Sequence, residues 1–198
     1  MGIRYKNQYA KSILLIDIRK NIMNYGNIKK TDIADGPGVR VTLFVSGCTH
    51  HCKECFQPET WDFSYGDEFT DDVRRQIIEL LKPAYISGFT ALGGEPWEPD
   101  NQRALLPLIE EIREKYPKKT IWMYSGYTYD ELKGAGRARC EVTDKLLSLI
   151  DVLVDGEFMI DKKDISLSYR GSSNQRLIDV KLTEKTGVIT CISDDLCR

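Results

Sequence analysis

Strand-like and helix-like segments alternate along this chain, and that alternation limits the possible folds more than any other feature of the sequence. Apolar residues fall at every second position in VRVTLFV, residues 39–45, and at helical spacing between residues 105 and 116. Chains that alternate in this way build mainly parallel sheets. We therefore expect an α/β fold with a mainly parallel sheet.

Start and stop signals define the expected elements. Thr70 is a suitable helix N-cap, and the run from Thr128 to Glu131 has the spacing of a capping box. Prolines or a glycine, at positions 83, 117 and 134, mark where three helices end. The predicted strands are 39–45, 85–92, 120–124 and 151–155, and a further helical segment lies around residues 146–150.

Chain length limits how far such a sheet can close. A complete eight-stranded (β/α) barrel typically needs about 250 residues, whereas this chain has 198. We therefore expect a partial, open (β/α) barrel with a mainly parallel sheet, formed by a single domain of residues 23–198. Residues 1–22 precede it as an extension without an assigned function, either a real addition to the fold or a misassigned translation start.

Three cysteines lie within one short loop directly after residues 39–45, at positions Cys48, Cys52 and Cys55. Thiolates are soft ligands that bind iron-sulfur clusters, zinc or Cu(I). A cubane cluster normally takes four cysteines, so a loop that offers three leaves one iron open to a substrate. The spacing therefore favours a [4Fe-4S] cluster that takes part in catalysis.

A structural zinc site is the alternative interpretation of the same loop. His50 or His51 would supply the fourth ligand of a Cys3His set. Both histidines lie inside the cysteine loop, so four ligands from eight consecutive residues would have to surround one ion, which is sterically awkward. A distant thiol is the other possible ligand, from Cys140, Cys191 or Cys197.

A second motif, GGEP at residues 93–96, follows the apolar run YISGFTAL. The ligand sites of α/β folds lie at the carboxyl ends of their strands. Gly93 and Gly94 let the backbone approach a ligand closely, their carbonyls can accept hydrogen bonds from an ammonium group, and Glu95 adds a negative charge. A methionine amino group fits this arrangement, although the same composition also occurs in ordinary turns.

The cysteine loop and GGEP, in this order, resemble the signature of the radical S-adenosylmethionine (SAM) superfamily. The segment DGPGVR, residues 35–40, resembles a motif of glycyl-radical-enzyme activases. Over most of the chain, the sequence resembles the family of anaerobic ribonucleoside-triphosphate reductase activating proteins, and the stretches that carry this resemblance are SGCTHHCKECFQPETWDF, WMYSGYTYDEL, LVDGEF and YRGSSNQRLID.

The resemblance implies a radical SAM enzyme in which Cys48, Cys52 and Cys55 bind a [4Fe-4S] cluster and SAM binds its open iron. Such an oxidoreductase cleaves SAM reductively and generates a glycyl radical on its protein partner, anaerobic ribonucleoside-triphosphate reductase, with electrons from a low-potential donor such as flavodoxin. The SAM-binding residues implied are Glu54, Phe56, Gly93, Gly94, Glu95, Ser125 and Asp155.

Two details refine this assignment. The superfamily often has an aromatic residue immediately before the third cysteine, whereas this chain has Glu54 there and Phe56 just after it. If Gly94 and Glu95 contact the methionine part of SAM, changes at these residues should weaken SAM binding and leave the cluster in place.

Polar residues near the motifs are weaker candidates. We expect Asp35 and Arg40 to form a local ion pair that shapes the DGPG loop. Arg170 and the segment 172–176 resemble the C-terminal motif of the activases, which implies contact with SAM or the partner, and their composition also describes a polar loop.

Composition narrows the class of protein. Hydrophobic residues make up 41% of the chain, the formal charge is −2, and the 28 basic and 30 acidic residues are interspersed without a basic stripe. Apolar runs are far shorter than a membrane span, and clustered thiols are typical of metal or redox chemistry in a reducing compartment. We expect a cytoplasmic protein that binds neither nucleic acid nor membrane.

Two other functions remain open at this point. An activase of another glycyl radical enzyme, such as pyruvate formate-lyase, would carry the same cluster loop. A non-enzymatic zinc module that recruits a partner would need the cysteine loop alone. The short chain and the YRGSSNQR segment favour the reductase activase.

Overall fold

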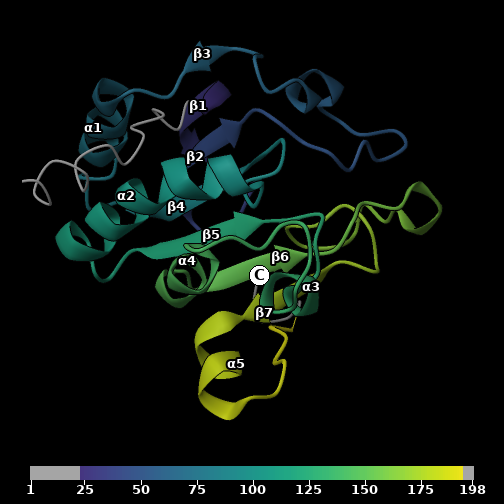
Figure 1. The fold of residues 1–198 in the computed structure, drawn as a ribbon. Coiled ribbons are helices and arrows are strands. Elements are labelled where there is room, and N and C mark those ends of the chain that lie inside the picture. Colours follow the sequence, from purple (N-terminus) through teal and green to yellow (C-terminus); the bar gives the residue numbers. More distant parts are fainter. Residues whose placement is uncertain (1–22, 194–198) are drawn as a thin grey trace, which may run out of the picture.

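The computed structural model describes residues 23–193, which form one sheet with helices packed against it (Figure 1). The extension 1–22 and Cys197 lie outside the described residues. The strands are β1 Asn24–Asp32, β2 Val39–Val45, β3 Asp67–Glu68, β4 Ile86–Gly93, β5 Thr120–Tyr124, β6 Val152–Asp155 and β7 Arg176–Asp179. The helices are η1 Pro58–Trp61, α1 Asp71–Leu80, α2 Pro99–Lys115, α3 Tyr129–Lys133, α4 Thr143–Leu149, η2 Ile160–Lys162 and α5 Val180–Thr186.

Parallel strands form the centre of the sheet, whose strand order is β3-β1-β2-β4-β5-β6-β7. The pairs β2–β4, β4–β5 and β5–β6 are parallel. Towards the edges, β1 pairs antiparallel with β2, and β7 pairs antiparallel with β6. The predicted α/β class and mainly parallel sheet are therefore confirmed.

The two faces of the sheet differ in what covers them. The parallel strands follow one another in a single direction from β2 to β6, so right-handed crossovers place the connecting helices on the same face. Val41, Leu43 and Val45 of β2 point into the main core there, as their alternation predicts. The opposite face carries a smaller apolar cluster of Trp122, Val152, Val154 and Leu177.

The predicted caps are confirmed. The Thr70 hydroxyl accepts a hydrogen bond from the backbone N–H of Val73 at the start of α1, and Thr128 and Glu131 form a reciprocal capping box at α3. Helix α2 begins at Pro99, where the missing N–H of proline costs no hydrogen bond, because a first-turn N–H has no acceptor within its helix. Among residues 23–193, no helix is long and apolar enough to cross a membrane.

The pattern does not predict β1, β3, β7 or α5. Strand β1, NYGNIKKTD, is mostly polar, and pairing with β2 holds it in the sheet. Helix α5 does carry local signals, because Asp179 accepts a hydrogen bond from Leu182 N at its start and Gly187 ends it with a φ of +71°. These caps are local signals for α5, which the predicted elements do not include, whereas the edge strands depend on distant partners.

Arg40 is fully buried on the face of β2 opposite the main core. This position corrects the predicted ion pair between Arg40 and Asp35. Its guanidinium donates to Thr90 Oγ1 at 2.7 Å and to the Phe89 carbonyl at 2.7 Å. The Asp35 carboxylate instead lies 3.8 Å from Lys29 Nζ. Side chains alternate along a strand, so Arg40 lies on the opposite face of the sheet from Val41. There, oxygens of the neighbouring strands accept hydrogen bonds from its guanidinium.

Candidate functional site

The cysteine loop leaves the carboxyl end of β2 and is fixed to η1. Gly47 N donates to the Thr60 carbonyl at 2.8 Å, and Cys48 N donates to the Trp61 carbonyl at 3.2 Å. Figure 1 shows the arrows of β5 and β6 pointing to the same end of the sheet as this loop. The loop is therefore anchored where α/β folds place their ligands.

Backbone turns inside the loop orient the remaining cysteines. Cys55 N donates to the Cys52 carbonyl at 3.1 Å. His51 and Glu54 have φ values of 53° and 61°, in the left-handed region that non-glycine residues seldom adopt. These reversals let a short loop bring three thiols to one side.

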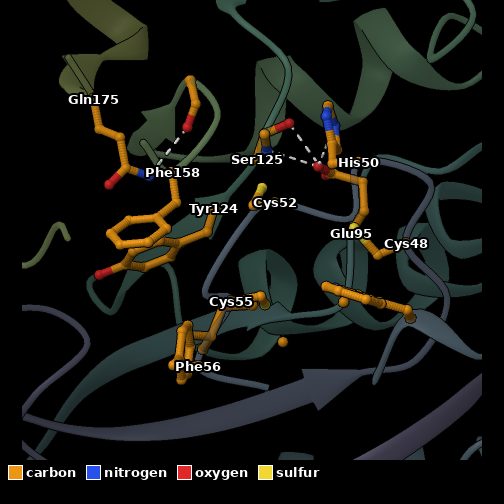
Figure 2. A pocket seen from close by; sticks show the side chains of 16 residues that line it. Cys48, His50, Cys52, Cys55, Phe56, Glu95, Tyr124, Ser125, Phe158 and Gln175 are labelled. Carbon is orange, nitrogen blue, oxygen red and sulfur yellow. Dashed lines mark hydrogen bonds and ion pairs between the residues drawn. The ribbon is translucent and has the colours of Figure 1, made fainter. Parts of the chain in front are cut away.

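All three cysteines line one cavity of about 110 Å³, shown in Figure 2. Cys48 is buried, whereas Cys52 and Cys55 are partly exposed. The residues predicted to bind cofactor that also line this cavity are Phe56, Gly93, Gly94, Glu95 and Ser125. The structure thus brings five of the seven predicted SAM residues together with the predicted cluster ligands.

Without a metal ion, the thiols of Cys48 and Cys52 favour their protonated form. Burial raises the pKa of Cys48 to about 12, and the charge of Glu95 acts in the same direction. Burial also raises the pKa of Cys52 to about 11, with a further contribution from Glu157. Because metals bind thiolates, loading of the loop must release these protons.

The loop offers three thiols to a metal centre, while its two histidines contact aromatic rings. Within residues 23–193, no three Cys, His, Asp or Glu side chains converge closely enough to hold one metal ion. A cluster distributes its cysteine ligands over different irons, so thiols spread around one cavity suit it. The histidines of the zinc alternative have other partners, since His51 stacks on Trp61 and His50 contacts Tyr127.

Glu95 connects the three segments that surround the cavity. Its buried carboxylate accepts hydrogen bonds from Gly126 N at 2.7 Å and Ser125 Oγ at 3.1 Å, and lies 3.2 Å from His50 Nε2 (Figure 2). Burial lowers the pKa of His50, but the negative charges of the adjacent Glu95 and of Glu157 more than offset this, so the pKa lies above its usual value. Glu95 N also donates to the Gly47 carbonyl at 2.8 Å, so the two motifs are in direct contact.

Gly94 leaves no room for a side chain. A Cβ atom at this position would lie 2.6 Å from the Gly47 carbonyl oxygen and 2.8 Å from that of Thr60. Gly93 has a φ of +108°, and its Cβ would lie 2.8 Å from the Val45 carbonyl oxygen. The expectation that a larger residue at position 94 would leave the cluster loop in place needs correction, because that residue would push the loop away.

Asp155 and Glu54 lie outside the lining of the cysteine cavity. The fully buried Asp155 carboxylate accepts hydrogen bonds from Arg176 Nε at 2.9 Å and from Tyr129 N at 2.7 Å. Glu54 is exposed and lines a second, neighbouring cavity. The structure therefore gives Asp155 partners within the protein, and its neighbour Gly156 reaches the cavity instead.

Replacement of Arg176 by leucine should lower the free energy of unfolding by about 2 kcal/mol, because it leaves the buried Asp155 carboxylate without its cation; the partial exposure of Arg176 keeps the loss below that of a fully buried pair. Urea denaturation of the metal-free protein measures this change. The matched control is Arg75→Leu, which removes an exposed ion pair with Asp72 and should cost less than about 1 kcal/mol. Equal losses in both variants would contradict a structural role for the Asp155 pair.

Tyr124 and Phe158 line the cavity without having been singled out as site residues, whereas Gln175 belongs to the segment 172–176 for which the resemblance implies contact with SAM or the partner. Tyr124 ends β5, and Phe158 follows the VDGE segment. Both line the cavity together with Gln175, whose side chain donates to the Gly156 carbonyl at 3.0 Å (Figure 2). Tyr124 has a local signal, since it stands at the carboxyl end of a predicted strand, whereas the only signal for Phe158 is its place in LVDGEF, one of the stretches that carry the family resemblance.

Comparison with known proteins agrees with this geometry. A family model described as a 4Fe-4S single cluster domain matches residues 34–178. The chain is 44% identical to the anaerobic ribonucleoside-triphosphate reductase-activating protein of Haemophilus influenzae, over 81% of this chain and 100% of that protein. This chain belongs to the anaerobic ribonucleoside-triphosphate reductase-activating protein family. The family's proteins in Escherichia coli K12 and Enterobacteria phage T4 are 45% and 35% identical, over 77% and 78% of this chain and 96% and 93% of their own lengths.

Membership of this family makes the chain an iron-sulfur protein of the activating-enzyme type. The range matched by the cluster-domain model, residues 34–178, includes the cysteine loop, the GGEP turn and Gln175. The whole cysteine cavity therefore lies within the part of the chain that matches the cluster domain.

Proposed function

We propose that this protein is a radical SAM activase that cleaves SAM reductively and generates a glycyl radical on anaerobic ribonucleoside-triphosphate reductase. The observation that carries the proposal is the direct contact between the cysteine loop and the GGEP turn around one cavity, made by the hydrogen bond from Glu95 N to the Gly47 carbonyl. Three thiols and an amino-acid cradle at the carboxyl ends of parallel strands are the parts that this chemistry needs.

The roles of the protein residues follow from their positions. Cys48, Cys52 and Cys55 would hold a [4Fe-4S] cluster, and the backbone of Gly93 and Gly94 would face SAM. When bound, a cluster reduced by the electron donor would supply one electron, and SAM would accept it with cleavage of its sulfonium C–S bond to methionine and a 5′-deoxyadenosyl radical, which would take a hydrogen atom from a glycine of the reductase. Glu95 would position the cavity walls through its contacts with three segments.

Apolar side chains complete the cavity and would protect reactive species from water. Phe56, Tyr124 and Phe158 line its side away from Glu95, as Figure 2 shows. A hydrophobic shell of this kind controls solvent access and tunes the potential of a cluster. No general acid or base is required, because the cofactor performs the bond cleavage.

The wider setting of the site is part of the same proposal. The connecting helices pack into the main core on one face of the sheet, which supports a partial, open (β/α) barrel whose other face would admit a segment of a protein substrate. Electrons would come from a low-potential donor such as flavodoxin. We also infer a cytoplasmic location and no nucleic-acid partner, since the charges are interspersed and thiols of this kind suit a reducing compartment.

The decisive experiment combines anaerobically reconstituted protein, SAM, dithionite and anaerobic ribonucleoside-triphosphate reductase. We expect a glycyl radical on the reductase by electron paramagnetic resonance, with methionine and 5′-deoxyadenosine as products. A reaction without SAM is the control. Activation of pyruvate formate-lyase in place of the reductase would transfer the assignment to that enzyme, and stoichiometric zinc without iron would indicate a zinc module.

A further inference from the structure

A second cavity, of about 500 Å³, lies beside the cysteine cavity. The two cavities share five lining residues: Phe56, Leu92, Tyr124, Phe158 and Gln175. The wall that contains Tyr124 and Phe158 is therefore common to both cavities. A molecule in the second cavity would lie next to the cavity that the three cysteines line. Asp35, from the loop before β2, and Glu54, from the loop after it, also border the second cavity.

The outer wall of the second cavity is a hairpin-like excursion between β6 and β7. Asp164 N donates to the Gly171 carbonyl at 3.2 Å, and Ser173 N donates to the Lys162 carbonyl at 2.9 Å, which closes the base of this excursion. Its tip carries Ile165, whose side chain is 95% exposed. We call residues 163–171 the outer wall.

Apolar side chains at the mouth of this cavity lack the burial that such groups favour. Ile165 on the outer wall is almost fully exposed, Leu167 is half-buried, and Phe56 across the cavity is 73% exposed. Exposed apolar groups around a concave surface mark a place where another molecule binds. The hydrophobic gain from covering them would be the main source of affinity.

The size and charge of the second cavity indicate which class of molecule would bind there. A volume of this order accepts a ligand-sized object and not a folded domain. Charged side chains of both signs border the cavity, with Asp35, Glu54 and Asp164 near Lys163 and Arg170. A nucleic acid would need a basic surface, whereas apolar groups with mixed charges suit a polypeptide segment.

We propose that the outer wall, residues 163–171, docks an extended segment of the reductase, with an apolar side chain of that segment packed against Ile165 and Leu167. This inference rests on the proposed function, since a reductase glycine must reach the cysteine cavity. The segment would pass over Ile165 and enter the second cavity, and the shared wall of Tyr124 and Phe158 would lead it towards the cluster.

The test replaces Ile165 by glutamate and measures the affinity of the reconstituted protein for the reductase by anaerobic fluorescence anisotropy. We expect binding to weaken at least about tenfold, because a charge would be buried against an apolar partner. The matched control is Val188→Glu, which places the same charge at a 67% exposed apolar residue beyond α5 and should bind like the wild type. Thermal melting of both variants checks the fold.

A second variant, Ile165→Ala, removes the side chain without adding charge and should weaken binding by about three- to tenfold. Unchanged affinity in both Ile165 variants would overturn the inference, as would an equal loss in Val188→Glu. The affinity measurement does not depend on SAM cleavage. If wild-type protein binds the reductase through Ile165 but never cleaves SAM, the proposed function fails while the docking surface stands.

Discussion

Cys52→Ala should abolish the iron-sulfur cluster and, with it, the glycyl radical on the reductase. Among residues 23–193, three thiols line the cavity, so loss of one leaves two protein ligands for a cluster that needs three. His50 is not a substitute, because its Nε2 lies 3.2 Å from the Glu95 carboxylate. Iron analysis and visible absorption after anaerobic reconstitution measure the cluster, and electron paramagnetic resonance measures the radical.

Cysteines outside the cavity provide the controls for this result. Cys140 is half-buried beside Thr143, whose hydroxyl lies 3.6 Å from its sulfur, and Cys191 is exposed next to β7. Cys140→Ala and Cys191→Ala should each retain wild-type iron. Loss of iron in either control would reveal a ligand outside the loop, and a full cluster in Cys52→Ala would exclude the three-cysteine assignment.

Gly94→Ala should destabilise the protein by about 3 kcal/mol and prevent normal cluster loading. The added Cβ would lie 2.6 Å from the Gly47 carbonyl oxygen and 2.8 Å from that of Thr60, and both are backbone atoms that cannot rotate away. Relief of the clash requires the cysteine loop to move from the GGEP turn. Urea denaturation of the metal-free protein and the iron content after reconstitution measure the two effects.

Gly136→Ala is the matched control for this substitution. Its Cβ would lie 3.2 Å from the Glu131 carbonyl oxygen, a contact that a shift of a few tenths of an ångström relieves. We expect a loss of less than about 1 kcal/mol there and a normal cluster. If Gly94→Ala were equally stable and lost only SAM affinity, Gly94 would serve the ligand directly and the packing explanation would be wrong.

The parts of the fold that follow local rules are readable from the sequence. Alternation in VRVTLFV correctly assigns Val41, Leu43 and Val45 to one buried face, since side chains of a strand alternate whatever lies beside it. Thr70 and the Thr128 capping box locate helix starts for the same reason, because a cap contacts only its own helix. Strand β1 has no such signal, as its polar residues acquire their conformation from pairing with β2.

The same distinction between local signals and distant contacts applies to the candidate site. The spacing of Cys48, Cys52 and Cys55 indicates soft-metal chemistry because the loop is short enough for its three thiols to act together. The partners of Asp155 are different, since its carboxylate is paired with Arg176 from the neighbouring antiparallel strand β7. No local pattern around residue 155 indicates that pairing.

The sequence by itself therefore determined the α/β class, the cluster loop and the family resemblance, because each depends on residues close together in the chain. Only the tertiary structure decided which distant groups come into contact. Arg40 donates to oxygens of the neighbouring strands, Gly94 packs against the Gly47 carbonyl, and the outer wall borders the second cavity. These contacts join segments far apart in the chain, and the pairing and packing of the sheet bring them together.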